Sequence, residues 1–325
     1  MLFYPAVFYF SKRHRAYIIE LIDFYTVKRG RGLNIQWYPG HMTKTRRQIE
    51  ADLGQVDLVA EVVDARIPIA SRNPDIDMLA ASKPRLIILN RADQADPAGN
   101  QTWARYFRGQ GFAVLETDAK TGKGVNQFSA TARTLLKEQI EKWKVKGQVG
   151  RAIRTMVVGV PNVGKSTFIN QVARRKSAKA ADRPGVTRGK QWVIVDSSLS
   201  LLDTPGILWP KFEDEQVGLH LAYTGAVKDD IIDVETLACN LMETLARRYP
   251  NALKERYKLD PSPRPADQDP IAYGYGLLEE AAGKRGFRIS GGDVDTERMS
   301  RILLDEFRSG KLGRFTLELP PEAAE

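Results

Sequence analysis

The 325-residue sequence predicts an α/β fold, in which a mostly parallel sheet with helices on both faces is followed by a small all-helical C-terminal domain. Three observations predict it. Buried-strand patterns alternate with helical patterns between residues 42 and 202. A glycine-rich loop follows one strand pattern and opens a helix pattern. After Trp209 the strand patterns fade, and apolar residues recur at helical spacing.

The first 33 residues differ in composition from the rest of the chain. Residues 2–10 are apolar and aromatic, and residues 12–15 are basic, so the charges follow the apolar run instead of preceding it as in a signal peptide. We expect residues 1–33 to be an extension that is disordered or reflects a mis-set translation start. A tether to a membrane surface is the alternative.

Residues 34–209 carry the strand and helix patterns of the predicted α/β domain. Strands are expected at residues 56–63, 85–89, 113–116, 153–158, 191–195 and 199–202. Helices are expected at residues 42–53, 100–110, 127–144 and 165–174. Ligands of such sheets bind beyond the carboxyl ends of the strands, so the motifs that follow the strands predict the site.

Residues 210–325 are predicted to form the helical domain. Apolar residues recur at helical spacing in residues 216–250 and 296–308. Pro261, Pro263, Pro265 and Pro270 predict a stiff break between helical segments, because proline disrupts a helix interior. The acidic, proline-containing end at residues 319–325 is expected to be frayed.

A phosphate-binding loop is predicted at residues 159–167. Gly159, Gly164, Lys165 and Ser166 have the spacing of the phosphate-loop motif, between a strand and a helix. Lys165 is expected to reach the β- and γ-phosphates and Ser166 to ligate Mg²⁺, while backbone N–H groups surround the phosphates. The candidate nucleotide contacts are Pro161, Asn162, Val163, Gly164, Lys165, Ser166 and Thr167.

Two further segments complete the predicted phosphate site. Asp203 begins an Asp-x-x-Gly motif at the end of a strand, where its carboxylate would hold Mg²⁺ and the Gly206 amide would contact the γ-phosphate. Thr187, in a glycine-proline loop between the two motifs, is the expected switch ligand of Mg²⁺. A plain surface turn is the alternative for that loop.

The sequence also predicts a site for guanine. Asn90 and Asp93 follow a strand, and the Asp93 carboxylate can accept hydrogen bonds from the guanine N1 and N2 donors, which adenine lacks. Arg91 stands where such motifs usually have lysine. Backbone contacts to guanine O6 are expected from the next strand end, at Thr117, Ala119 and Lys120.

The motifs occur in an unusual order, because the guanine motif precedes the phosphate loop by about 70 residues. Ordinary P-loop GTPases have the reverse order, so the sequence predicts a circularly permuted P-loop GTPase domain. Ile207 stands where many GTPases have a glutamine that orients water. Asn162 matches the asparagine of GTPases that use K⁺, so K⁺ is a second candidate cofactor beside Mg²⁺.

Together these motifs resemble the ribosome biogenesis GTPase A family of circularly permuted GTPases. The resemblance rests on the segments 34–42, 64–68, 90–93, 159–167 and 203–206, and reaches the tail at 313–318. It implies a GTPase that binds the large ribosomal subunit precursor and its rRNA late in assembly. It also implies that His41 assists hydrolysis in place of the missing glutamine. Lys165 and Thr187, from the motifs above, are the other candidate catalytic residues. The alternative for His41 is packing at, or capping of, the helix that starts near it.

The charge distribution favours nucleic-acid contacts in the first part of the chain. Residues 1–206 contain 33 basic and 18 acidic residues, whereas residues 207–325 contain 16 and 22. Candidate RNA contacts are Lys44, Arg46, Arg47, Lys137, Lys142, Lys144, Lys146, Arg151, Arg154, Lys284, Arg285 and Arg288, with Trp143 and Phe287 among them.

The remaining expectations concern the compartment and the mode of action. The single cysteine, Cys239, favours a reducing cytoplasm. The sequence contains no run of 18 or more uncharged apolar residues, so a membrane span is not expected. We expect a monomer away from the ribosome. The alternative function is a GTP-gated RNA-binding module with incidental hydrolysis, which would show no stimulation of turnover by large-subunit particles.

Overall fold

The computed structural model describes residues 41–176, 191–209, 212 and 214–321. The N-terminal extension, the segment 34–40 and the candidate switch residue Thr187 lie outside the described residues. For His41 the structure describes the backbone only.

The centre of the molecule is a six-stranded sheet with the strand order β3-β2-β1-β4-β6-β5. Its strands are β1 (Leu58–Asp64), β2 (Arg85–Asn90), β3 (Ala113–Glu116), β4 (Ile153–Val158), β5 (Gln191–Asp196) and β6 (Leu199–Asp203). All neighbouring strands are parallel except β5 and β6, which are antiparallel. The predicted mostly parallel sheet is confirmed.

Helices cover both faces of this sheet. The helical segments of this part are α2 (His41–Asp52), η1 (Leu53–Gln55), α3 (Pro74–Leu79), α4 (Pro97–Gly109), η2 (Val125–Gln127), α5 (Phe128–Leu135), α6 (Lys137–Val145) and α7 (Lys165–Lys176). Successive residues of a strand point to opposite faces. Ile87 of β2 packs in one buried cluster with Phe107 of α4, whereas Ile88 belongs to a second cluster with Phe128 and Phe168.

Two elements of this region differ from the sequence-based expectation. Helix α3 was not expected, although Asn73 and Pro74 carry a start signal: the Asn73 side chain accepts a hydrogen bond of 2.9 Å from the Asp75 N–H, and Pro74 occupies the first helical position. The helix expected at residues 127–144 is divided, because Leu136 leaves helical geometry with φ −98° and ψ 14°. Two shorter helices, α5 and α6, result.

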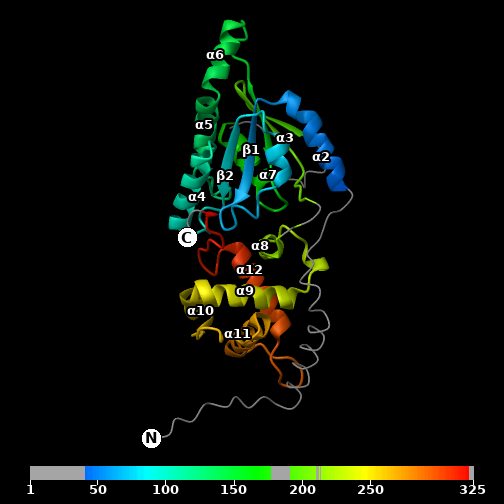
Figure 1. The fold of residues 1–325 in the computed structure, drawn as a ribbon, viewed down its shortest axis with the longest axis vertical. Helices are drawn as coiled ribbons and strands as arrows, with labels where there is room; N and C mark the ends of the chain where they lie inside the picture. The colour runs from blue at the N-terminus through cyan, green and yellow to red at the C-terminus, as the bar shows by residue number, and fades with distance from the viewer. Residues whose placement is uncertain (1–40, 177–190, 210–211, 213, 322–325) are drawn as a thin grey trace.

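The helical C-terminal region lies beyond the carboxyl ends of the parallel strands (Figure 1). Its elements are α8 (Glu215–Tyr223), η3 (Asp229–Ile231), α9 (Val234–Arg248), α10 (Pro250–Tyr257), α11 (Pro270–Lys284) and α12 (Thr296–Ser309). The expected helical segment 216–250 is interrupted after α8. Pro270 starts α11 beside its capping residue Asp269 instead of ending a helix, because proline suits the first helical position.

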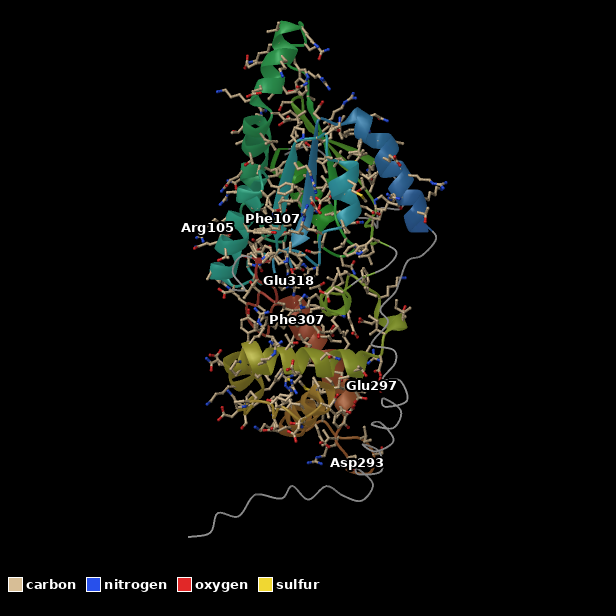
Figure 2. All side chains as sticks on the ribbon, viewed as in Figure 1. Arg105, Phe107, Asp293, Glu297, Phe307 and Glu318 are labelled. Atoms are coloured by element: carbon tan, nitrogen blue, oxygen red, sulfur yellow. The ribbon has the colours of Figure 1, made fainter. Side chains whose placement is uncertain are left out.

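The chain after α12 returns to the sheet. The Phe315 N–H donates to the Gln94 carbonyl at 2.9 Å, and the Leu317 N–H donates to the Arg66 carbonyl at 2.8 Å. Glu318 and Phe307 lie between the sheet and α9 (Figure 2). One buried apolar cluster extends from the sheet through Tyr223 into the helices. The predicted boundary between residues 209 and 210 stays a prediction.

In the described part of the chain, no helix has both the length and the apolar character that crossing a membrane requires.

Candidate functional site

The glycine-rich loop connects β4 to α7 with a tight backbone path. Gly159 has φ 151° and Gly164 has φ 98°, and a Cβ at these positions would lie 2.4 Å from the Val62 carbonyl oxygen and 2.5 Å from the Asn90 Nδ2 atom. Both positions therefore require glycine. The loop leads directly into the N-terminus of α7 at Lys165, and the N-terminus of a helix favours an anion.

Lys165 lies buried at the base of this loop. Its Nζ donates to the Val160 carbonyl oxygen at 2.9 Å, and an ideal Cβ on Gly206 would lie 3.1 Å from that Nζ. Burial lowers the pKa of Lys165 to about 8, and the charge of Asp203 opposes part of this shift. The structure therefore brings Lys165, Asp203 and Gly206 together, as the sequence predicts.

Two oxygen donors meet beside Lys165. The Ser166 hydroxyl donates to the Asp203 Oδ2 atom at 3.1 Å, and Thr204 is held by donation from its hydroxyl to the Val157 carbonyl at 2.7 Å. A hydroxyl and a carboxylate are the hard oxygen ligands that Mg²⁺ prefers. The residues present therefore fit a magnesium ion held partly by protein and partly by phosphate.

The guanine motif has two segments, residues 90–93 and residues 117–120. Asn90, in the first segment, contacts both the second segment and the phosphate loop. Its Nδ2 donates to the Val163 carbonyl at 2.9 Å, while its Oδ1 accepts from the Ala119 N–H at 3.0 Å and from the Thr117 hydroxyl at 3.1 Å. The buried Asn90 side chain makes these hydrogen bonds to other protein groups, so it shapes the guanine site. Thr117 and Ala119 are held at the same place by it.

Asp93 is the exposed acidic residue of the guanine motif. Desolvation and the charge of nearby Asp118 raise the pKa of its carboxyl. Asp118, which lies inside the second segment, accepts hydrogen bonds from the Lys120 N–H at 2.9 Å and the Thr121 N–H at 3.2 Å. Asp118 thus shapes this loop from within, a role that the sequence reasoning missed.

Arg91 lies between the guanine motif and the phosphate loop. Its backbone has φ 58°, and its Nη2 donates to the Asn162 carbonyl at 2.7 Å. Its Nε lies 3.6 Å from the Asp64 carboxylate, which also binds the buried Arg66 through two hydrogen bonds of 2.9 and 2.8 Å. Burial by itself would raise the pKa of Asp64, but the two guanidinium groups hold it below its usual value.

An open cavity of about 1270 Å³ lies in front of the phosphate loop. The loop residues from Pro161 to Thr167, apart from the buried Val163, line one side together with Gly206. The helical region lines the other side with Gly225, Asp229 and Arg308. Asp93, Thr117, Ala119 and Lys120 do not line it. Sequence reasoning missed the contribution of the helical region, because its residues belong to no local motif.

The candidate RNA contacts do not form one surface. Helix α6, which carries Lys137, Lys142 and Lys144, projects at the opposite end of the molecule from α11, which ends at Lys284 (Figure 1). Several of the cations are already paired: Arg46 lies 3.2 Å from Asp75, and Arg151 lies 2.8 Å from Asp57. Trp143 is buried under Arg151, so its ring is not exposed for stacking on a base.

Comparison with known proteins finds relatives of this chain among the ribosome-associated GTPases. A family model described as "50S ribosome-binding GTPase" matches residues 154–256. Ribosome biogenesis GTPase A of Priestia megaterium is 47% identical over 292 residues, which is 90% of this chain and 99% of that protein. Mitochondrial ribosome-associated GTPase 1 of Mus musculus is 33% identical, covering 87% of this chain and 90% of that protein.

Two solved structures are also similar to this chain. The crystal structure of GNP-bound YlqF from T. maritima is 29% identical and superposes with a TM-score of 0.57, covering 86% of this chain and 99% of that one. A GDP-bound structure of TM YlqF has a TM-score of 0.59 at 30% identity, covering 84% and 99%. The chain therefore belongs to the ribosome biogenesis GTPase A family.

Proposed function

We propose that this protein is a Mg²⁺-dependent GTPase that acts as a switch in late assembly of the large ribosomal subunit. The proposal is supported mainly by the three hydrogen bonds of the Asn90 side chain. They connect the first guanine segment to the phosphate loop and to the second guanine segment. The names of the relatives, which refer to ribosome biogenesis, supply the process.

The phosphate-loop and Asp-x-x-Gly motifs support the following roles for the phosphate-site residues. Lys165 binds the β- and γ-phosphates, and the Gly206 amide binds the γ-phosphate. Ser166 and Asp203 would hold Mg²⁺, with Thr187 as the switch ligand. When bound, the ion neutralises charge on the phosphates. The loop residues 161–167 contact the nucleotide through their backbone.

The guanine base is selected by Asp93. Its carboxylate accepts the N1 and N2 donors of guanine, while Arg91 and the segment at Thr117, Ala119 and Lys120 surround the ring. A hydrogen-bonding site of this kind rejects a base that leaves its polar groups unpaired.

Hydrolysis needs a group that orients water, because Ile207 is fully buried where other GTPases use glutamine. We assign this role to His41, which lies at the first residue of α2. A neutral imidazole can orient or polarise water. Asn162 is the proposed K⁺ ligand, and equal turnover in K⁺ and Na⁺ would contradict that assignment.

The proposed partner is the immature large subunit and its rRNA, met in the cytoplasm by a monomeric protein. The excess of basic residues in the first 206 residues supports contact with RNA phosphates. GTP would order the segments at Thr187 and Asp203 and favour binding to the particle, and hydrolysis would reverse this.

The test is depletion of the protein in the organism that encodes it, followed by sucrose-gradient sedimentation of the ribosomal particles. An immature large-subunit particle should accumulate, and the wild-type chain should restore the normal subunit ratio. The Asp93→Asn chain should not restore it, because its amide replaces an acceptor with a donor toward guanine. Normal subunit ratios after depletion would refute the proposal.

A further inference from the structure

One sharp turn of the helical region touches the phosphate loop. Helix α8 ends there because Gly225 adopts φ 76°, a left-handed conformation that favours glycine. The Gly225 carbonyl accepts a hydrogen bond of 2.6 Å from the Asn162 Nδ2 atom. Since a carbonyl can only accept, this contact directs the amide nitrogen of Asn162 toward the turn and its oxygen away from it.

Arg308, in the last turn of α12, holds this turn in place. Its Nε donates to the Tyr223 carbonyl at 3.1 Å, and its Nη2 donates to the Ala222 carbonyl at 2.9 Å. Its two terminal nitrogens also pair with the Asp229 carboxylate, each at 2.7 Å. An ideal Cβ on Gly225 would lie 3.4 Å from the Arg308 Nε, so the guanidinium packs directly against the turn.

Arg91 completes a ring of contacts from the side of the sheet. Besides its bond to the Asn162 carbonyl, it donates from Nη1 to the Arg308 carbonyl at 3.2 Å. The ring runs from Arg91 to Asn162, from Asn162 to Gly225, and through Arg308 back to Arg91. Two arginine side chains thus link the guanine motif, the phosphate loop, the turn after α8 and the end of α12.

We propose that Arg308 is a positioning residue of the nucleotide site. It holds the Gly225 carbonyl where that carbonyl orients the Asn162 amide, and the position of the helical region thereby sets how tightly the phosphate loop holds its nucleotide. The inference rests on the proposed function, since it requires guanine nucleotide at this loop. A partner that shifts α12 would then change the rate of nucleotide release.

The first test is the variant Arg308→Lys, compared with Arg301→Lys as the matched control. A single ammonium group keeps the charge of Arg308 but cannot reach two carbonyls and Asp229 together. Arg301 lies on the same helix and makes an exposed ion pair with Glu297 at 3.0 Å. With fluorescent GDP, Arg308→Lys should release nucleotide about tenfold faster than wild type, the effect of one lost charged hydrogen bond.

Steady-state turnover gives a second measurement on the same variants. The Michaelis constant for GTP should rise with the release rate in Arg308→Lys, while kcat changes less, because Arg308 does not touch the reacting atoms. Arg301→Lys should resemble wild type in both. Equal release rates in Arg308→Lys and Arg301→Lys would overturn the proposal.

A double-mutant cycle separates positioning from a general structural effect. Asn162→Gly removes the amide and tolerates the φ of 57° at this position. If Arg308 acts through Asn162, Arg308→Lys should change GDP release by less than about twofold in the Asn162→Gly background. A persisting tenfold effect would show that Arg308 acts by another route and would refute the proposal.

Asp229→Asn is a second variant for the GDP-release test if Arg308→Lys does not fold. It leaves the Arg308 bonds to the turn carbonyls in place and should accelerate GDP release about threefold, whereas an unchanged rate would count against the proposal. Wild-type protein that binds no GDP would refute the proposed function itself. If the wild-type protein binds GDP but the variants release it at the wild-type rate, only this inference is refuted.

Discussion

At the scale of single residues, Lys165 carries a pH dependence that can be measured. Burial lowers its pKa to about 8 because the desolvated site favours the neutral amine. Bound phosphates favour the ammonium form, so nucleotide binding should raise the pKa and take up a proton when the pH is near or above 8. Below that value the free protein is already protonated.

We therefore expect GDP affinity to fall about tenfold between pH 7 and pH 9, as linkage requires for a group that binds one proton with the ligand. Calorimetry in buffers of different ionisation enthalpy measures the proton uptake, and circular dichroism over the same pH range controls for unfolding. Affinity that stays constant over this range would contradict the lowered pKa of Lys165.

Residue contacts within a motif were predictable, whereas those between motifs and the helical region were not. Lys165, Ser166 and Asp203 lie where the phosphate-loop spacing predicts, because strand ends place them at one edge of the sheet. The bond from Arg91 to the Arg308 carbonyl joins residues 217 positions apart. A contact at that separation depends on the whole tertiary fold, and no local pattern reports it.

At the scale of elements, helices α9 and α11 pack unusually closely. An ideal Cβ on Gly274 of α11 would lie 2.0 Å from the Cys239 carbonyl oxygen and 2.7 Å from the carbonyl carbon. The glycine therefore allows one helix backbone to touch the other. Glycines disfavour a helix when it is considered alone, and this helps explain why α11 was harder to predict than α12, whose apolar residues recur at helical spacing.

Gly274→Ala should consequently destabilise the protein by about 3 kcal/mol, because the two backbones must separate to admit one methyl group. Gly276→Ala is the matched control: it lies on the same helix with no atom within 4 Å of the added Cβ, and it should stabilise by about 0.5–1 kcal/mol. Urea unfolding measures both. Equal effects of the two substitutions would refute this packing explanation.

At the scale of the whole molecule, the C-terminal chain joins the helical region to the sheet. Phe315 is buried between Phe307, at a ring-centroid distance of 5.7 Å, and Tyr249, at 5.0 Å. The Glu318 carboxylate accepts hydrogen bonds from the Ile69 and Ala70 N–H groups at 2.6 and 3.1 Å. The overall sheet was predictable from period and motif, but this return of the chain was not, since residues 312–318 form neither helix nor strand.

Phe315→Ala should destabilise the protein by about 3–5 kcal/mol, the usual cost of truncating a buried phenylalanine. It should also loosen the helical region from the sheet, so that calorimetry shows two transitions instead of one. Leu319→Ala, four residues later at a position 55% exposed, should change stability by no more than about 0.5 kcal/mol. A single, unshifted transition in Phe315→Ala would contradict this role.

The returning chain also bears on how the protein is synthesised. Residues 312–318 leave the translating ribosome after every strand and helix described above, yet their N–H groups bind Gln94 and Arg66, beside the guanine motif. Folding during synthesis proceeds from the N-terminus, so the sheet can form early while its last partner is still in the exit tunnel. The contacts of Phe315 and Leu317 with Gln94 and Arg66 are therefore added to a sheet that can already have formed.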